Sequence, residues 1–325
     1  MTRTAPQPAT RPVSKAATSA ARTRWLQDNG VYVAVAVLLL FNALFTSNFL
    51  TLGNFTTQLV QAAPVLIVAL GMALVIGTEG VDLSVGAVMA LAAAVIPLYL
   101  GAGPLMAITM ALVVGVLAGA FNGFLVARVG IQPIVATLAL LVGGRGLALV
   151  IADGQLVQLR DPSFLELGAG NVAGIPISVL IAGALALVIA AVTNRTTFGR
   201  QLVAIGGNRK AATLAGLPVT RVLIGVYAIC GVLAAVAGVI ATSRLAASDP
   251  ADMGLLMELS AITAVVVGGT PLTGGKVRVL GTVFGVVLMQ LVRATLIKHN
   301  LPDSIAQMIQ AAIIVAAVYV ARERR

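Results

Sequence analysis

The chain has 325 residues, of which 59% are hydrophobic and only 10% charged, and its formal net charge is +10. A soluble domain carries about 25% charged residues. This composition excludes a soluble enzyme or binding domain and predicts an all-α protein that crosses a membrane many times. The single cysteine excludes an intramolecular disulfide and a cysteine metal cluster.

Residues 1–24 contain five basic residues, no acidic residue and several Pro, Ser and Thr residues. We expect a disordered basic tail there, followed by a transmembrane domain over residues 25–325. The same composition is typical of a transit peptide, which is the alternative interpretation. Basic residues elsewhere lie at the ends of apolar runs rather than on one soluble face, so the net charge does not indicate a nucleic-acid partner.

Ten apolar runs follow the tail, and most approach the roughly 20 residues that cross the hydrocarbon layer. They lie at about residues 30–46, 59–77, 84–101, 104–126, 131–152, 175–193, 221–242, 258–270, 278–297 and 303–321. The eighth run is short, which predicts either a half-helix or additional membrane residues before it. We therefore expect about ten transmembrane helices.

The distribution of basic residues predicts the orientation. With the N-terminus in the cytoplasm, sixteen Lys and Arg residues fall on the cytoplasmic side and four on the outer side, while Arg145 lies within a span. Because basic loops stay in the cytoplasm, we expect both termini there. The outer connections are acidic instead, and include Asp249, Asp252 and Glu258.

Two glycine-rich interruptions resemble each other. Residues 75–88 read VIGTEGVDLSVGAV, and residues 266–279 read VVGGTPLTGGKVRV. Each places a turn containing Ser or Thr between two apolar runs, which predicts a weak internal duplication of a helical bundle, as in many transporters. The alternative is that glycine and threonine are simply frequent in membrane helices.

Polar side chains inside a bilayer tend to face a cavity or a partner helix. Gln58, Gln61, Asn122 and Gln290 are the residues that we expect to line a path for a polar solute, and hydrogen bonds between helices are the alternative for each of them. Gly119 and Gly123 lie close to Asn122 and predict close helix packing. Arg145 is expected to pair with an acid such as Asp153.

The longest polar stretch in the middle of the chain covers residues 193–222 and encodes a short helix. Asn208 can cap its N-terminus, residues 209–215 can be helical, and Gly216 suits the position after its C-terminus. Arg209 and Lys210 oppose the helix dipole, which favours a partner with acidic groups. A solvated loop is the alternative.

No pattern indicates catalysis. The chain has no HExxH pattern and no Ser/His/Asp set, and the GGTPLTGGK stretch lacks the spacing of an ATP-binding loop. We therefore expect no enzyme activity and no cofactor in this chain. If ATP drives transport, it must bind to another protein.

Four motifs resemble one family. GTEGVDLSVGAVMALAAA, FNGFLVARVGIQPIVATLAL, TTFGRQLVAIGGNRKAATLAGLPV and VVVGGTPLTGGKVRVLGT are similar to the permease subunits of bacterial ABC importers for ribose, xylose, arabinose and galactose. The similarity extends over roughly residues 58–321, and GGTPLTGG resembles the galactofuranose permeases slightly more than the ribose permeases. Glu79 and Val81 replace Gly and Ile of the usual turn, which predicts an altered turn.

The resemblance implies a monosaccharide path across the bacterial inner membrane. It implies an ABC ATPase that binds ATP and Mg, a second identical or different permease chain, and a periplasmic or lipid-anchored sugar-binding protein. It also implies that the middle loop contacts the ATPase through a set of residues at the short helix: Gly207, Asn208, Arg209, Lys210, Ala211, Ala212 and Gly216. An ion-coupled secondary transporter is the alternative, although Glu79 and Asp82 near the inner surface are its only candidate acids.

Overall fold

The computed structural model describes residues 15–302, 304–305, 307–309, 311–313 and 315, and these are mainly helical. The helices are α1 (Lys15–Phe45), α2 (Leu52–Gly77), α3 (Val85–Leu100), α4 (Pro104–Phe124), the π-helical η1 (Leu125–Val129), α5 (Pro133–Ile151), α6 (Pro162–Ala169), α7 (Ile177–Arg195), α8 (Thr197–Gly207), α9 (Arg209–Leu214), α10 (Val219–Leu245), α11 (Met257–Val267) and α12 (Val279–Lys298). Four two-residue strands form two antiparallel pairs: β1 (Val157–Gln158) with β4 (Ala247–Ser248), and β2 (Asn171–Val172) with β3 (Ile175–Pro176).

Six segments are long and apolar enough to cross a membrane: Leu52–Gly77, Pro104–Val129, Pro133–Ile151, Ile177–Arg195, Val219–Leu245 and Val279–Lys298. Three shorter apolar helices accompany them at Asn29–Phe45, Val85–Leu100 and Met257–Val267. The predicted all-α polytopic membrane protein is therefore confirmed. The number ten remains a prediction, because the last apolar run lies mostly outside the described residues.

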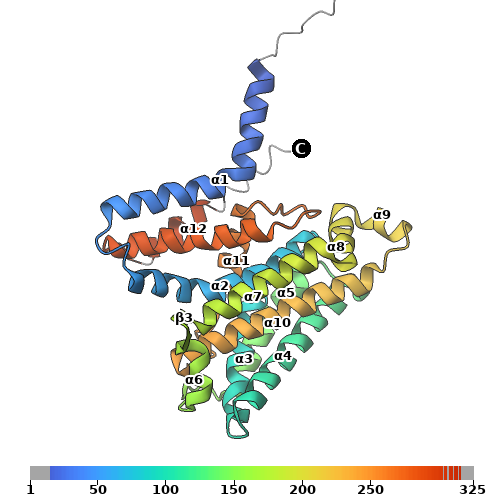
Figure 1. Cartoon of the computed structure of the whole chain (residues 1–325). Coiled ribbons are helices and arrows are strands. Elements are labelled where there is room, and N and C mark those ends of the chain that lie inside the picture. Colours follow the sequence, from blue (N-terminus) through green and yellow to red (C-terminus); the bar gives the residue numbers. More distant parts are fainter. Residues whose placement is uncertain (1–14, 303, 306, 310, 314, 316–325) are drawn as a thin grey trace, which may run out of the picture.

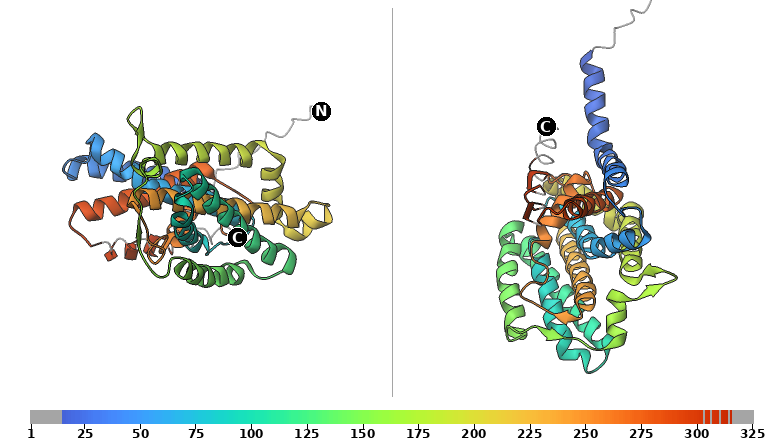
Figure 2. Two further views of the ribbon diagram at one scale, coloured as in Figure 1. Left: turned by 90° about the horizontal axis from the view of Figure 1, so that it is seen from below. Right: turned by 90° about the vertical axis from the view of Figure 1, so that its left-hand side faces the viewer.

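The first helix begins at Lys15, inside the stretch for which the sequence predicts a tail, while residues 1–14 lie outside the described part of the chain. Figure 1 shows the bundle with α9 at one extremity and α6 at the opposite one, and Figure 2 gives two further views. We call these the α9 end and the α6 end. The two turns at residues 78–84 and 268–278 lie at or near the α9 end.

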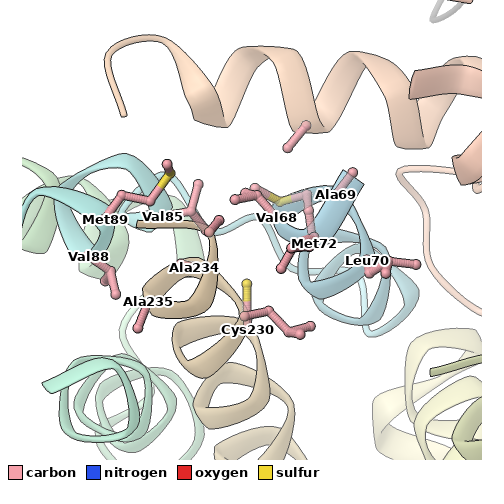
Figure 3. Packing of buried hydrophobic residues seen from close by; sticks show 14 of the residues in the cluster. Val68, Ala69, Leu70, Met72, Val85, Val88, Met89, Cys230, Ala234 and Ala235 are labelled. Carbon is pink, nitrogen blue, oxygen red and sulfur yellow. The ribbon is translucent and has the colours of Figure 1, made fainter. Parts of the chain in front are cut away.

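The centre of the bundle is formed by α2, α3 and α10. In α2 and α10 the most apolar windows are 72% and 67% buried, whereas the windows in α4, α5 and α7 are 22% buried and leave most of their surface for lipid or a partner. Figure 3 shows Met72 of α2, Val88 of α3 and Cys230 of α10 within this core. The apolar composition of these three helices on all sides explains their central place.

Helices α4 and α10 pack so closely that backbone meets backbone. A Cβ atom on Gly119 would press on the Tyr227 carbonyl oxygen and lie 3.0 Å from the Ala228 Cα, and one on Gly123 would lie 2.7 Å from the Ile224 Cα. The close helix approach predicted from Gly119 and Gly123 is therefore confirmed.

Between α10 and α11 the chain turns back into the bundle. Residues 246–256, which we call the re-entrant segment, leave the end of α10 and run along α3. Ser248 donates a hydrogen bond to the Ala93 carbonyl oxygen at 2.7 Å, and Gly254 packs on Gly86, seven residues earlier in α3. At 1.5 Å of rise per helical residue, the segment therefore penetrates by about 10 Å, and the short eighth run, α11, is a half-helix.

Candidate functional site

A cavity of about 500 Å³ opens where the re-entrant segment meets α2, α10 and α12. Its polar and charged lining residues are Gln61, Arg244, Asp249, Asp252 and Arg293. Its remaining lining residues are Pro64, Val65, Met89, Ala241, Leu245, Met253, Gly254, Met257 and Ile297. The volume falls within the usual range of small-molecule sites, about 300–1,000 Å³.

The charges in the cavity lining balance. Two guanidinium groups and two carboxylates face this space, and Arg244 also donates a hydrogen bond to the Val60 carbonyl oxygen at 3.1 Å, which ties α10 to α2. Such a lining offers both strong donors and strong acceptors without net charge. It can hydrogen-bond a polar solute. The sequence led us to expect neutral polar groups, because these acids appeared to belong to outer loops.

Three of the four predicted path residues meet at the cavity edge. The Gln290 amide donates to the Gln58 side-chain oxygen at 2.7 Å and to the Gln61 side-chain oxygen at 2.9 Å. Gln61 itself lines the cavity. The three amides therefore link α12 to α2 and place one polar group in the cavity wall.

Asn122 lies elsewhere and does not line this cavity. Its amide donates to the Ser84 hydroxyl at 2.8 Å, and Ser84 in turn donates to Asp82 through its hydroxyl at 2.6 Å and its backbone N–H at 2.9 Å. Asp82 is 1% exposed, so it caps the start of α3 rather than lying in a solvated loop. This network fixes the turn at residues 78–84 against α4.

Glu79 occupies a position of the turn at residues 78–84 that glycine would adopt more easily. Glu79 has a φ of 65°, in the left-handed region that glycine adopts without strain. Glu79 therefore accepts a strained backbone, at a cost of roughly 1–3 kcal/mol, and its exposed side chain faces the α9 end.

The predicted short helix is present as α9. The Asn208 side chain accepts a hydrogen bond from the Ala211 N–H at 2.9 Å, which is an N-cap. At the other end Gly216 has a φ of 75°, and the N–H groups of Gly216 and Leu217 donate to the carbonyl oxygens of Thr213 and Ala212. This pattern is the Schellman motif, so both ends of α9 are closed by local hydrogen bonds.

The outer face of α9 is basic with one large apolar side chain. Arg209 and Lys210 are exposed and line a hollow of about 530 Å³ together with Glu79, Gly207, Asn208 and Thr213. Leu214 is 90% exposed, which the sequence reasoning missed, although an isolated leucine in a polar helix was a visible signal. Ala211 faces outward, whereas Ala212 is buried against the bundle.

At the α9 end, backbone atoms of three glycine residues contact one another directly and join α8 to the core helix α2. The Gly275 N–H donates to the Gly77 carbonyl oxygen at 3.0 Å, which joins the turn at 268–278 to the end of α2. Gly206 of α8 lies against both groups, because its Cβ would press on the Gly77 oxygen and lie 2.7 Å from the Gly275 nitrogen. We call Gly77, Gly206 and Gly275 the glycine junction.

No group of three or more His, Cys, Asp or Glu residues in the described part of the chain could hold a metal ion. The cavity and the exposed α9 surface are therefore the two candidate functional regions.

Comparisons with known proteins agree with a transport role. Residues 54–318 match the family described as branched-chain amino acid transport system / permease component. The chain is 36% identical over 313 residues to the galactofuranose transporter permease protein YtfT of Escherichia coli K12, covering 93% of this chain and 92% of that protein. It is 35% identical over 307 residues to the ribose import permease protein RbsC of the same strain, covering 93% and 95%.

A third relative is the fructose import permease protein FruF of Bifidobacterium longum, 37% identical over 281 residues, with 82% of this chain and 79% of that protein covered. A comparison with solved structures found no match. A helical membrane bundle with a charge-balanced cavity and an exposed basic helix at its opposite end defines a transport subunit. The chain belongs to the family of branched-chain amino acid transport system permease components.

Proposed function

We propose that the chain is the transmembrane permease subunit of an ATP-driven ABC importer for a monosaccharide. The observation that carries this proposal is the similarity, over most of the chain, to permeases named for galactofuranose, ribose and fructose. The family description mentions branched-chain amino acids, whereas these relatives are named for sugars, and we follow the relatives. The carboxylates and guanidinium groups of the cavity can hydrogen-bond the hydroxyl groups of a sugar.

The two ends of the bundle offer the surfaces for the proposed partners. An ABC ATPase that binds ATP and Mg would dock at α9, where Arg209, Lys210 and Leu214 are exposed. A sugar-binding protein would deliver the solute at the α6 end, on the side where the cavity lies. A second permease chain, identical or different, would complete the path in the bacterial inner membrane.

An ion-coupled secondary transporter needs acids inside the membrane, and Asp82 and Glu258 are buried in the bundle. Asp82 is engaged in the cap of α3, and the relatives are named as import permeases, so we favour the ATP-driven mechanism. Purification of the tagged chain from its native membrane tests the choice. We expect an ABC ATPase to copurify in stoichiometric amount, and a chain that purifies without one while catalysing proton-driven uptake would overturn the proposal.

We predict that the α9 end is cytoplasmic, together with both termini. Most of the basic residues that the structure describes after α1 lie at that end, in η1, α8, α9, the turn at 268–278 and the adjacent ends of α7 and α10, as expected for cytoplasmic segments. Single cysteines at Asp161, before α6, and at Arg209 should be labelled by an impermeant maleimide from opposite sides in intact cells and inverted vesicles. The buried Cys230 adds little background. Labelling of both positions from one side would refute this topology.

We predict that Leu214→Asp weakens ATPase binding by roughly 10- to 100-fold, because burying a leucine side chain contributes about 1.5–3 kcal/mol. The side chain is 90% exposed, so the permease itself should fold normally. Leu52, 82% exposed at the start of α2 near the α6 end, offers the matched control Leu52→Asp. The affinity of the purified ATPase for the permease in nanodiscs is the measurement, and equal affinities for both variants would show that α9 is merely a solvated connection.

A further inference from the structure

The acidic wall of the cavity belongs to the part of the re-entrant segment that follows β4, which is neither helix nor strand. The re-entrant segment supplies Asp249, Asp252, Met253 and Gly254 to the lining. A chain without helix or sheet leaves backbone carbonyl groups that need partners when it lies at membrane depth. The hydrogen-bond donors that these carbonyl groups meet therefore determine how rigidly Asp249 and Asp252 are positioned.

The donors come from Arg145, a half-buried residue of α5 that does not line the cavity. Its Nη1 atom donates to the carbonyl oxygens of Ala251 at 2.9 Å and Pro250 at 3.4 Å, and its Nη2 atom donates to the Met253 carbonyl oxygen at 3.2 Å. No ion pair between Arg145 and Asp153 is described, so the expected pairing is replaced by these three contacts. The planar fork of a guanidinium group suits several carbonyl groups of one bent segment.

The electrostatics explain why an arginine can occupy this position in a spanning helix. A guanidinium group inside a membrane is costly unless it meets polar partners. Here three carbonyl dipoles meet its donors. The segment that carries these carbonyl groups also packs on α3 through Gly254 and Gly86.

We propose that Arg145 is a positioning residue for the solute cavity: from α5 it holds the re-entrant segment so that Asp249 and Asp252 face the solute. The inference rests on the proposed function only in naming the solute a sugar. The structural part of the proposal is that Arg145, which lies outside the cavity, fixes the position of Asp249 and Asp252 in the cavity lining. Loss of the guanidinium hydrogen bonds frees the turn around Met253 and displaces the carboxylates of Asp249 and Asp252.

The first test measures the segment directly. Met253 is 7% exposed, so a Met253→Cys variant of the full chain in its complex should react slowly with an impermeant maleimide. Adding Arg145→Gln should raise the labelling rate on the order of tenfold, since a charged hydrogen-bond donor is lost. Adding Arg160→Gln is the matched control, because Arg160 makes no side-chain hydrogen bond with any described residue, and it should leave the rate unchanged.

Arg145→Lys keeps the charge but not the fork, and it should give an intermediate labelling rate. If Arg145→Gln fails to assemble, the lysine variant decides the question. Equal labelling of the Arg145 and Arg160 variants would overturn the proposal. This result does not depend on transport, so it can be distinguished from a failure of the proposed function, in which the parent complex would import no monosaccharide.

The second test measures selectivity, which a merely structural role would not change. With the parent and Arg145→Lys complexes, relative uptake rates are measured for ribose, arabinose, fructose and galactose. Displacement of the two carboxylates should change the ratio of rates between the two best-transported sugars by several-fold. A uniform fall for every sugar, with an unchanged ratio, would show that Arg145 only stabilises the bundle.

Discussion

Replacement of Gly119 with leucine is expected to abolish assembly of the bundle. The Cβ atom would press on the Tyr227 carbonyl oxygen and lie 2.9 Å from the Tyr227 carbonyl carbon, and these are backbone atoms of α10 that cannot rotate away. The helices would have to separate, and overpacking in a close-packed core costs about 1–3 kcal/mol or more. Separation would also break the contacts of Gly115 and Gly123 on the same face, so the total loss should exceed the cost at one site.

The matched control is Gly183→Leu in α7, since a Cβ atom there would meet no atom within 4 Å. Both variants place the same side chain in an apolar helix, and only one of them meets a neighbouring backbone. Thermal unfolding and gel filtration in mild detergent give the result. We expect Gly183→Leu to behave like the parent and Gly119→Leu to aggregate or unfold at least several degrees lower. Equal behaviour would refute the described packing of α4 on α10.

Replacement of Gly206 with alanine is expected to uncouple ATP hydrolysis from transport. The glycine junction brings α8 into direct contact with the end of α2 and with the turn at 268–278. Because α9 follows α8 directly, a displacement of α9 by the ATPase would reach α2 and α11, both of which line the cavity, through backbone contacts alone. A methyl group on Gly206 would push apart the Gly77 carbonyl and the Gly275 N–H.

Gly183 in α7 provides the control, because its Cβ atom would meet no atom within 4 Å and it lies outside the predicted ATPase contact. Both glycines lie in helices and gain helix propensity from alanine, about 1 kcal/mol, so the difference between the variants isolates the contact. Sugar uptake and substrate-stimulated ATP hydrolysis should both be near parental values in Gly183→Ala. In Gly206→Ala we expect uptake to fall at least tenfold. Equal coupling in the two variants would show that the junction transmits nothing.

Most of the helices could be predicted from the sequence. Nine of the ten apolar runs each contain one helix of the structure, because helices in hydrocarbon must satisfy their own backbone and the apolar stretch alone defines them. The short helix α9 could be predicted for another local reason. Asn208 and Gly216 close its two ends through hydrogen bonds within a few residues, so no distant contact is needed.

The cavity could not be predicted in the same way. Asp249 and Asp252 follow a complete span and have the polarity of an outer loop, yet the chain there turns back into the bundle. The donors that permit this course come from Arg145, more than 100 residues away in the chain. Likewise the contact of Gln290 with Gln58 and Gln61 depends on the packing of α12 on α2, which no local pattern encodes. The sequence therefore allowed us to predict the polar role of Gln58, Gln61 and Gln290, but not the place of Asp249 and Asp252 in the cavity lining.

The most direct test of the proposed function is sugar uptake into proteoliposomes that contain the permease, its copurifying ATPase and its binding protein. Ribose, arabinose, fructose, galactofuranose and leucine would be supplied in turn, with ATP or a non-hydrolysable analogue at the α9 side. We predict uptake of at least one monosaccharide that requires ATP hydrolysis, and no uptake of leucine. Uptake of leucine alone, or sugar uptake driven by a proton or sodium gradient without ATP, would contradict the assignment.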